Sequence, residues 1–288
     1  MTTQSTLPIY RTAASLRQAV NEWRGQGLRV ALIPTMGALH AGHMALVSRA
    51  LKLADRAIAS VFVNPTQFGP QEDFGSYPRK ETEDALMLAQ TGAHSLYAPL
   101  VEEMYPQGFA TSITVAGPSA GLCGDFRPGH FSGVATVVTK LLLQSGVDVA
   151  LFGEKDYQQL QVIRRLVRDL DIPVVIEGVP TIRESDGLAM SSRNAYLTQG
   201  ERLIAPALYR TLKAMAKSLS AGATIADQIA WGEAQLLNAG FASIDYLSVR
   251  DADSLAAVDR VIGPARILVA THLGKARLID NVAVSAAL

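Results

Sequence analysis

The feature that most restricts the fold is a regular alternation of short apolar runs with longer segments of helical periodicity. The apolar runs are rich in β-branched residues and predict five strands, at Arg29–Pro34, Ala57–Val63, Ser95–Ala98, Val147–Phe152 and Val174–Gly178. The segments between them predict helices near His43–Ala54, Lys80–Thr91, Ser132–Gln144 and Tyr157–Leu170. Continuous apolar strands separated by helices indicate a parallel sheet covered on both faces. We therefore expect a doubly wound α/β domain that binds ligands at the carboxyl ends of its strands.

The pattern changes after about residue 182. Two predicted helices, Gln199–Ala221 and Ile225–Ala239, are followed by two predicted strands, Ile244–Arg250 and Ile267–Thr271. Helices followed by strands are typical of an α+β arrangement. The sequence thus predicts a first domain over 1–182 and a smaller second domain over 183–288.

Charge and cysteine content restrict the partners and the compartment. Lys+Arg and Asp+Glu both number 26 in the 288 residues, so no basic excess favours a nucleic acid or an anionic membrane as partner. Val134–Leu143, the most apolar stretch, is interrupted by Lys140 and is too short to span a bilayer, and the start of the chain resembles no signal peptide. Cys123, the single cysteine, excludes an internal disulfide and is interpreted as a buried or bystander residue. These features favour the cytoplasm.

The strand Arg29–Pro34 runs into a turn suited to phosphate. Gly37 and Gly42 let the backbone approach a ligand closely, and the helix that follows offers unpaired N–H groups and the positive end of its dipole. His40 and His43 share a face in a first helical turn and have N–H groups to donate. Structural histidines and a metal-binding pair are the alternatives, although no third ligand lies nearby in the sequence. The spacing matches neither the P-loop nor the GxGxxG fingerprint.

Two further segments carry groups suited to a polyphosphate. Lys155 lies just beyond the strand Val147–Phe152 and is expected to face the ligand crevice. Asp156 next to it either caps the following helix or holds Mg²⁺ with the phosphates. Met190-Ser191-Ser192-Arg193-Asn194, at the expected domain junction, presents two hydroxyls and a guanidinium, or is a plain polar turn.

Together these segments resemble the nucleotidyltransferase superfamily, with His40-Ala41-Gly42-His43 as its HxGH motif. More specifically, the chain from about residue 7 to 284 resembles the pantoate–β-alanine ligase family. The segments that carry this resemblance are Pro34-Thr35-Met36-Gly37, Phe62-Val63-Asn64-Pro65-Thr66-Gln67-Phe68, Tyr77-Pro78-Arg79, Arg127-Pro128-Gly129-His130-Phe131, Gly153-Glu154-Lys155-Asp156-Tyr157-Gln158-Gln159-Leu160, Met190-Ser191-Ser192-Arg193 and Arg277-Leu278-Ile279-Asp280-Asn281.

The resemblance implies an activity and a fold. Members of the family condense pantoate with β-alanine at the expense of ATP and release AMP and pyrophosphate. The implied fold is Rossmann-like, with a smaller C-terminal domain that closes over the active site, in a homodimer. Mg²⁺ is the implied cation.

The resemblance also implies the site residues. The expected catalytic residues are His43 and Lys155. The expected ATP-binding residues are Met36, Gly37, Ala38, Leu39, His40, Ala41, Gly42, His43, Gly153, Glu154, Lys155, Asp156, Ile182, Met190, Ser191, Ser192 and Arg193. Gln67 and Gln159 are expected to bind pantoate, and Gln67 also to face β-alanine, with Asn64 as a further substrate-binding residue. Arg127 and His130 either bind substrate or support the loop. No metal ligands are assigned.

Two positions depart from the family pattern, and one segment suggests motion. Thr66 stands where Met or Leu is frequent, and Ala41 where an acidic residue is common; neither puts the activity in doubt. Gly69–Ser76 is rich in turn formers and follows Gln67 directly. We expect it to act as a gate that keeps water from a reactive intermediate.

The expected chemistry begins with attack of a carboxylate on the α-phosphorus of ATP, which makes an acyl adenylate with a good leaving group. Lys155, His43, Arg193, the serines and Mg²⁺ are expected to stabilise the charge that builds on pyrophosphate. Neutral glutamines orient the acid without occupying its lone pairs as an arginine would. Nucleotidyl transfer to a phosphate and a non-catalytic nucleotide sensor remain alternatives, and the neutral charge disfavours a tRNA-charging enzyme.

Overall fold

The computed structural model describes residues 7–70 and 72–285. The chain divides into two compact units, and each contains segments that are distant in sequence. The first unit comprises the chain as far as Val115 together with Arg127–Glu154 and Val162–Pro180. The second comprises Ala116–Phe126, Lys155–Gln161 and the chain from Thr181 onward.

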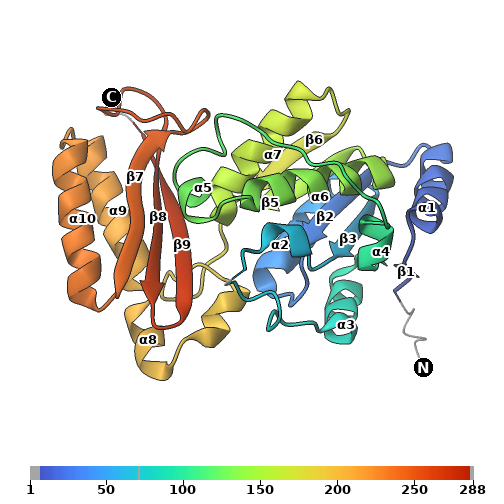
Figure 1. Cartoon of the computed structure of the whole chain (residues 1–288), viewed down its shortest axis with the longest axis horizontal. Helices are drawn as coiled ribbons and strands as arrows, with labels where there is room; N and C mark the ends of the chain where they lie inside the picture. Colours follow the sequence, from blue (N-terminus) through green and yellow to red (C-terminus); the bar gives the residue numbers. More distant parts are fainter. Residues whose placement is uncertain (1–6, 71, 286–288) are drawn as a thin grey trace. The chain divides into compact units, whose positions relative to one another are not determined.

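The first unit is built on six parallel strands in the order β1-β4-β3-β2-β5-β6. The predicted doubly wound α/β fold is therefore confirmed (Figure 1). Along the chain, the helices and strands as far as β6 are β1 (Ile9–Tyr10), α1 (Ala13–Gly25), β2 (Val30–Thr35), α2 (Ala41–Leu53), β3 (Arg56–Val61), η1 (Pro65–Gln67), α3 (Glu81–Thr91), β4 (Ser95–Tyr97), α4 (Val101–Met104), α5 (Cys123–Phe126), α6 (His130–Ser145), β5 (Val149–Gly153), η2 (Glu154–Asp156), α7 (Tyr157–Asp169) and β6 (Val175–Val179).

The strand order reverses between β2 and β5. From β2 the chain proceeds outward through β3 and β4, and then returns to pair β5 with the opposite edge of β2, with Ala31 opposite Val149 and Leu32 opposite Ala150. In open parallel sheets, ligands bind where the strand order reverses, beyond the carboxyl ends of the strands. The segment with the two histidines follows β2, and the segment with Lys155 follows β5. Both predicted phosphate-binding segments therefore start at this reversal.

Apolar residues of the strands face helices on both sides of the sheet. α2 and α3 pack together on one side, and α1 and α6 pack together on the other. The central strands are buried on both faces, as their continuous apolar runs predict. Alternate residues of β2, Ala31 and Ile33, pack in a core cluster with Leu46, Val47 and Ala50 of α2. This core holds the start of α2 close to the end of β2.

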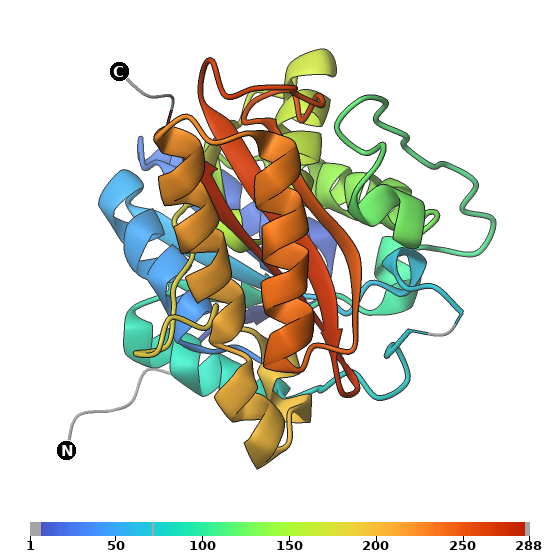
Figure 2. The same ribbon diagram turned by 90° about the vertical axis from the view of Figure 1, so that its left-hand side faces the viewer.

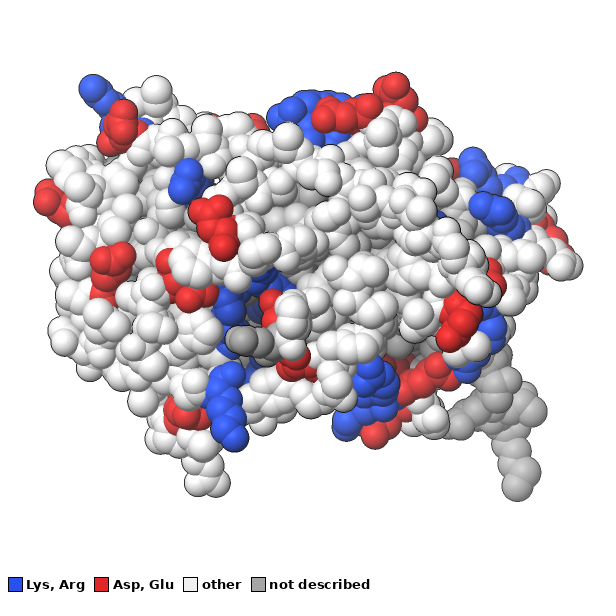
Figure 3. All heavy atoms as spheres, viewed as in Figure 1, with Lys and Arg blue, Asp and Glu red and all other residues white. Residues whose placement is uncertain are grey.

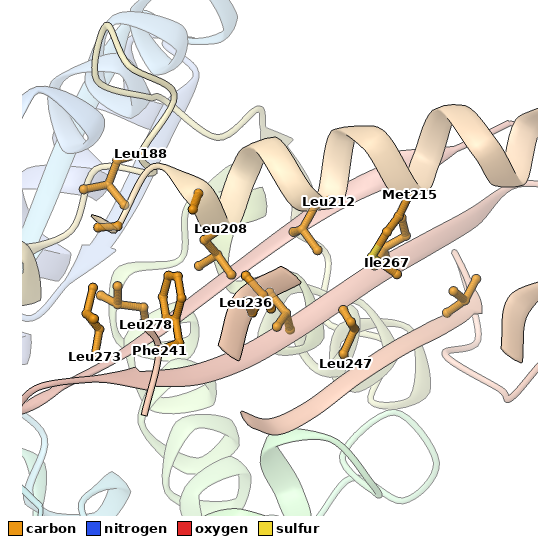
Figure 4. Close-up of a cluster of buried hydrophobic side chains, with 14 of the residues drawn as sticks. Leu188, Leu208, Leu212, Met215, Leu236, Phe241, Leu247, Ile267, Leu273 and Leu278 are labelled. Atoms are coloured by element: carbon orange, nitrogen blue, oxygen red, sulfur yellow. The ribbon is translucent and has the colours of Figure 1, made fainter. Parts of the chain in front are cut away.

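The second unit contains a three-stranded antiparallel sheet in the order β7-β8-β9, and so confirms the predicted α+β pattern. Helices α9 and α10 lie side by side over one face of this sheet (Figure 2). Leu208, Leu212 and Met215 of α9 belong to one core cluster with Ile267 and Leu247 of the sheet (Figure 4). The remaining elements are η3 (Ser192–Tyr196), α8 (Gln199–Ile204), α9 (Ala207–Ser220), α10 (Ile225–Ala239), β7 (Ser243–Asp251), β8 (Ala265–Leu273) and β9 (Ala276–Val284).

The structure corrects one predicted element and adds others. The single helix expected over Gln199–Ala221 is two helices, α8 and α9, which meet at Pro206. Proline has no N–H to donate within a helix, and its ring crowds the preceding turn. The structure adds helix α1 and strands β1 and β9 to the predicted elements. Strand β1 has only two residues, and Asp280 and Asn281 interrupt the apolar pattern of β9.

Charged side chains of both signs are visible on one face of the molecule. On the face drawn in Figure 3, Lys and Arg are interspersed with Asp and Glu rather than gathered over a broad area of one sign. Among the described residues, no helix combines the length and apolar character needed to cross a lipid bilayer.

Helix α6 packs very closely on η1, the short helix that carries Gln67. A Cβ added at Gly133 of α6 would overlap the carbonyl oxygen of Thr66 and lie 2.8 Å from Cα of Gln67. Gly133 itself has no positive φ, so its lack of a side chain serves this contact rather than a turn. The close approach fixes the backbone around Gln67 against a buried helix.

We predict that Gly133→Ala lowers the free energy of unfolding by about 1–3 kcal/mol, because η1 or α6 must shift to admit the methyl group. Gly25→Ala is the matched control. Gly25 is the last residue of helix α1, and an added Cβ there would have nothing within 4 Å. The control is expected to be neutral or to stabilise by up to about 1 kcal/mol. Urea denaturation measures both, and equal effects of the two substitutions would contradict the packing argument.

Candidate active site

The turn after β2 has a backbone that excludes most side chains. Gly37 has φ +83°, and a Cβ there would lie 3.0 Å from both Oδ2 of Asp84 and Cγ1 of Val61. Ala38 also adopts the left-handed region, with φ 51°. A non-glycine residue is uncommon in this region, so the surrounding contacts must hold the turn.

Asp84 of α3 supplies those contacts. Its carboxylate accepts hydrogen bonds from the backbone N–H groups of Ala38 at 3.0 Å and Leu39 at 2.8 Å, while only 2% of the residue is exposed. Burial raises the pKa of Asp84, and the two N–H bonds oppose this shift. The carboxylate thus replaces the water that would otherwise solvate these backbone groups and fixes the path from β2 to α2.

The two histidines cap α2. His40 is the N-cap residue, and its Nδ1 accepts from the N–H of Gly42 at 3.1 Å. Nδ1 of His43 accepts from the N–H of His40 at 3.3 Å, and the two ring centroids lie 4.1 Å apart. Because Nδ1 is the acceptor in each ring, a neutral ring carries its proton on Nε2. The backbone therefore selects the tautomer in which Nε2–H is the donor.

Asn64 and Gln67 form a hydrogen-bonded pair in the same unit. Both residues are buried, and Nδ2 of Asn64 donates to Oε1 of Gln67 at 3.1 Å and to the carbonyl of Gly133 at 3.2 Å. Oδ1 of Asn64 in turn accepts from Tyr105 Oη at 2.7 Å. Nε2 of Gln67 lies 3.0 Å from Sδ of Met36. The turn after β2 and the predicted substrate glutamine are therefore in direct contact.

Arg127 and His130 hold the main chain of Gln67. His130 Nδ1 donates to the carbonyl of Gln67 at 2.9 Å, which leaves Nε2 to accept from Arg127 Nη1 at 2.9 Å. Arg127 also makes a bidentate ion pair with Glu72, with distances of 2.7 and 2.6 Å. Of the two roles predicted for Arg127 and His130, these contacts favour support of the loop.

The same ion pair fixes part of the segment that was expected to act as a gate. Glu72 lies in that segment, while Gln71 falls outside the described residues. Burial by itself would raise the pKa of Glu72, but the hydrogen bonds and charge of Arg127 outweigh it and hold the pKa below its ordinary value. At neutral pH the ion pair is therefore fully charged.

In the second unit, the middle of β9 is hydrogen-bonded to Lys155 and to the hairpin that precedes the serine–arginine segment (Ser191, Ser192 and Arg193). Nδ2 of Asn281 donates to the carbonyl of Lys155 at 2.9 Å. Asp280 accepts two hydrogen bonds from Arg183, at 2.6 and 2.9 Å. Arg183 pairs with Ala189 in a short antiparallel bridge, and Ile182 accepts from the N–H of Met190 at 3.0 Å. This hairpin leads directly into the segment with Ser191, Ser192 and Arg193.

The remaining predicted site residues lie in or next to these elements. Gly153 ends β5, and Glu154 and Asp156 lie in η2. Ser191 caps η3 by accepting from the N–H of Arg193 at 3.2 Å. Gln159 is partly exposed on the first turn of α7, whereas its neighbour Gln158 is buried and bonded to the carbonyls of Pro118 and Gly121.

In the described part of the chain, no three His, Cys, Asp or Glu side chains form a cluster that could hold a metal ion by themselves. Mg²⁺ usually keeps several waters and binds to one or two carboxylates and the phosphates of a substrate. The exposed carboxylate of Asp156, 3.9 Å from Nζ of Lys155, fits such a limited role. The structure therefore fits a magnesium ion that is carried largely by a nucleotide.

Sequence reasoning missed several residues that shape the site. Asp84 lies in the acidic first turn of α3, and acidic residues at a helix start usually face solvent. Only its hydrogen bonds with Ala38 and Leu39 reveal its role. Asp280 and Asn281 belong to a motif that carries the family resemblance, which predicts no role for them. A pair of adjacent polar residues in an otherwise apolar strand was the available signal.

We predict that Glu72→Gln lowers the free energy of unfolding by about 1–2 kcal/mol at neutral pH, because it removes a partly buried, bidentate ion pair. The pKa of Glu72 is lower in the folded protein, so the stability it contributes is complete above its unfolded pKa of about 4.3. That contribution should disappear as the pH falls through the lower folded value. Denaturation of both proteins from pH 7 to pH 2 measures this convergence.

Glu83→Gln is the control, since Glu83 pairs with Lys80 on the surface, where the two side chains are 67% and 54% exposed. Exposed ion pairs of this kind contribute about 0–1 kcal/mol. A difference between wild type and Glu72→Gln that stays constant over the whole pH range would contradict the assignment.

Comparison with known proteins identifies the family. The family described as pantoate-beta-alanine ligase matches residues 8–283. The pantothenate synthetase of Paramagnetospirillum magneticum is 65% identical over 276 residues, which cover 96% of this chain and 97% of that protein. The pantothenate synthetase of Rhodospirillum rubrum is 57% identical, with coverage of 96% and 99%.

Solved structures agree with the sequence relatives. A crystal structure of pantothenate synthetase from Thermus thermophilus has a TM-score of 0.91 at 48% identity and covers 96% of this chain and 99% of that one. The pantoate-beta-alanine ligase of Francisella tularensis, complexed with beta-gamma ATP and beta-alanine, has a TM-score of 0.81 at 33% identity, with coverage of 96% and 97%. By sequence and by fold, this chain belongs to the pantoate-beta-alanine ligase family.

Proposed function

We propose that this chain condenses pantoate with β-alanine, at the expense of ATP, to give pantothenate, AMP and pyrophosphate. The observation that carries the proposal is the match to the pantoate-beta-alanine ligase family over residues 8–283, which includes every predicted site residue. The capped turn after β2, with its fixed imidazole tautomers, is consistent with binding of a phosphate group.

The reaction proceeds in two steps. A carboxylate oxygen of pantoate attacks the α-phosphorus of ATP, the bond from that phosphorus to the bridging oxygen breaks, and pyrophosphate leaves. The amine of β-alanine then attacks the acyl carbon of the pantoyl adenylate, loses a proton, and displaces AMP. The enzyme need only hold the reactants in line and stabilise charge, and such positioning contributes on the order of 7–11 kcal/mol in well-oriented reactions.

The histidines and Lys155 stabilise the departing pyrophosphate. His43 and His40 act as neutral donors through Nε2–H, since the backbone occupies Nδ1 of each ring. Lys155 supplies a compact positive charge. The residues that we assign to ATP are Met36, Gly37, Ala38, Leu39, His40, Ala41, Gly42, His43, Gly153, Glu154, Lys155, Asp156, Ile182, Met190, Ser191, Ser192 and Arg193.

Gln67 and Gln159 bind pantoate. Oε1 of Gln67 accepts from Asn64 and Nε2 contacts Sδ of Met36, so we assign the second N–H of Nε2 as the donor to an oxygen of the acid. A neutral amide orients the carboxylate without lowering its nucleophilicity as strongly as a cation would. Asn64, Arg127 and His130 act as positioning residues for Gln67, since each bonds to its side chain or to its carbonyl oxygen.

A magnesium ion, when bound with ATP, neutralises phosphate charge, and Asp156 is the residue that we assign to it. We also propose that the protein acts in the cytoplasm and as a homodimer. The single cysteine supports a reducing compartment, and the family resemblance supports the dimer.

We expect the purified protein to catalyse ATP–pyrophosphate exchange that depends on pantoate, and to release AMP only when β-alanine is added. Labelled pyrophosphate measures the first step, and chromatography of the nucleotides measures the second. Retention of the nucleotide on the product would instead favour nucleotidyl transfer to another acceptor. ATP binding without exchange would favour a nucleotide sensor.

We expect His43→Ala and Lys155→Ala to lower the rate of exchange on the order of 100-fold or more, as the loss of one charge-stabilising donor does in other enzymes. Lys217→Ala is the control, because Lys217 is an exposed residue near the end of α9. The melting temperature of each variant shows whether it is folded. Exchange at the wild-type rate in folded Lys155→Ala would remove Lys155 from the catalytic group.

A further inference from the structure

The middle of β9 carries two adjacent polar residues that the proposed chemistry does not use. Asp280 and Asn281 are each 3% exposed in a strand whose other central residues are apolar. Burial of an acid and an amide is costly unless each is fully hydrogen-bonded. Their partners therefore show what the pair stabilises.

Asp280 fixes the hairpin that leads to the serine–arginine segment. Its bidentate ion pair with Arg183 is supported by a further bond from Arg183 Nη1 to the carbonyl of Gly187 at 3.1 Å. The guanidinium of Arg183 also lies over the ring of Tyr209, 3.6 Å from its centroid. Bidentate and stacking contacts together hold an arginine in one orientation. The base of the hairpin is thus fixed to β9.

Asn281 fixes the segment around Lys155. Nδ2 donates to the carbonyl of Lys155 at 2.9 Å, while Oδ1 accepts from Nε of Arg266 at 2.7 Å. Arg266 in turn stacks on Tyr157, with its guanidinium carbon 4.0 Å from the ring centroid. The side-chain amide of Asn281 therefore holds the main chain of Lys155 and, through Arg266, contacts the ring of Tyr157.

We propose that Asn281 is a positioning residue for Lys155, and that Asp280 and Asn281 together hold Lys155 and the hairpin at 182–190 in a fixed relation within the second unit. This inference rests on the proposed function, because it takes Lys155 as a phosphate-stabilising group. A lysine side chain has a flexible four-carbon stem, so a fixed main chain is what limits the region its ammonium can reach. A shift of about 1 Å in a catalytic group can lower a rate about 100-fold.

Asn281→Asp is the sharpest variant, because it keeps the size of the side chain and the acceptor for Arg266 but replaces the donor to Lys155 with an oxygen. We expect the kcat of pantoate-dependent ATP–pyrophosphate exchange to fall about 10- to 100-fold, with the KM for ATP changed less than about threefold. Asn281→Ala, which removes the donor without adding a charge, is measured in parallel in case the aspartate variant does not fold.

Thr271→Val is the matched control. Thr271 is fully buried in β8 of the same sheet, and its hydroxyl donates to the carbonyl of Ser243 at 2.7 Å. The control loses one buried bond from a side chain to a backbone carbonyl, without a link to Lys155. Its kcat per folded molecule should match wild type, whereas a kcat loss as large as that of the Asn281 variants would overturn the proposal.

A second readout follows Lys155 without relying on activity. Reductive ¹³C-methylation labels the lysine amines of the free protein, and Lys155→Arg assigns the signal of Lys155 in a ¹H–¹³C spectrum. We expect this signal to move in Asn281→Asp and Asn281→Ala but to stay in place in Thr271→Val. An unchanged signal and kcat in both folded Asn281 variants would overturn the proposal. Absence of exchange in the wild type would instead contradict the proposed function, while the spectrum still tests the positioning role.

Discussion

The parallel pairing of β2 with β5 is the constraint on which the organisation of the first unit depends. Because β5 returns to the free edge of β2 rather than continuing outward from β4, the carboxyl ends of two central strands lie next to each other where the winding reverses. The segment with His40 and His43 follows one of these strands, and the segment with Lys155 follows the other. The hydrophobic burial of both strands thus also determines where polar chemistry can be placed.

Hydrogen bonds to the main chain dominate the arrangement of the first unit. Asp84 satisfies the N–H groups of the strained turn, and the two imidazoles satisfy the start of α2. His130 and Arg127 bond to the carbonyl of Gln67. These side chains position the backbone, and the backbone then determines which ring nitrogen carries the proton and which half of the amide remains for a substrate.

In the second unit, two consecutive buried side chains, Asp280 and Asn281, hold segments that are distant in sequence. In a strand, neighbouring side chains point to opposite faces, so one dipeptide can reach in two directions. Asp280 bonds to Arg183 and Asn281 bonds to Lys155, and both remain buried because each is satisfied. The helices and apolar residues that cover one face of the sheet provide the rigid support that such positioning requires.

The sequence by itself determined the alternation of strands and helices, the parallel first sheet, the α+β pattern of the second part and the family resemblance, because apolar periodicity and glycine turns act over short distances along the chain. It did not predict the division at Pro206, the inclusion of Ala116–Phe126 and Lys155–Gln161 in the second unit, or the roles of Asp84, Glu72 and Asn281. Each of these depends on a partner that is distant in sequence, such as Ala38 for Asp84 and Lys155 for Asn281. A polar side chain looks the same in the sequence whether it faces water or a buried backbone group, and only the tertiary structure decides which of the two it meets.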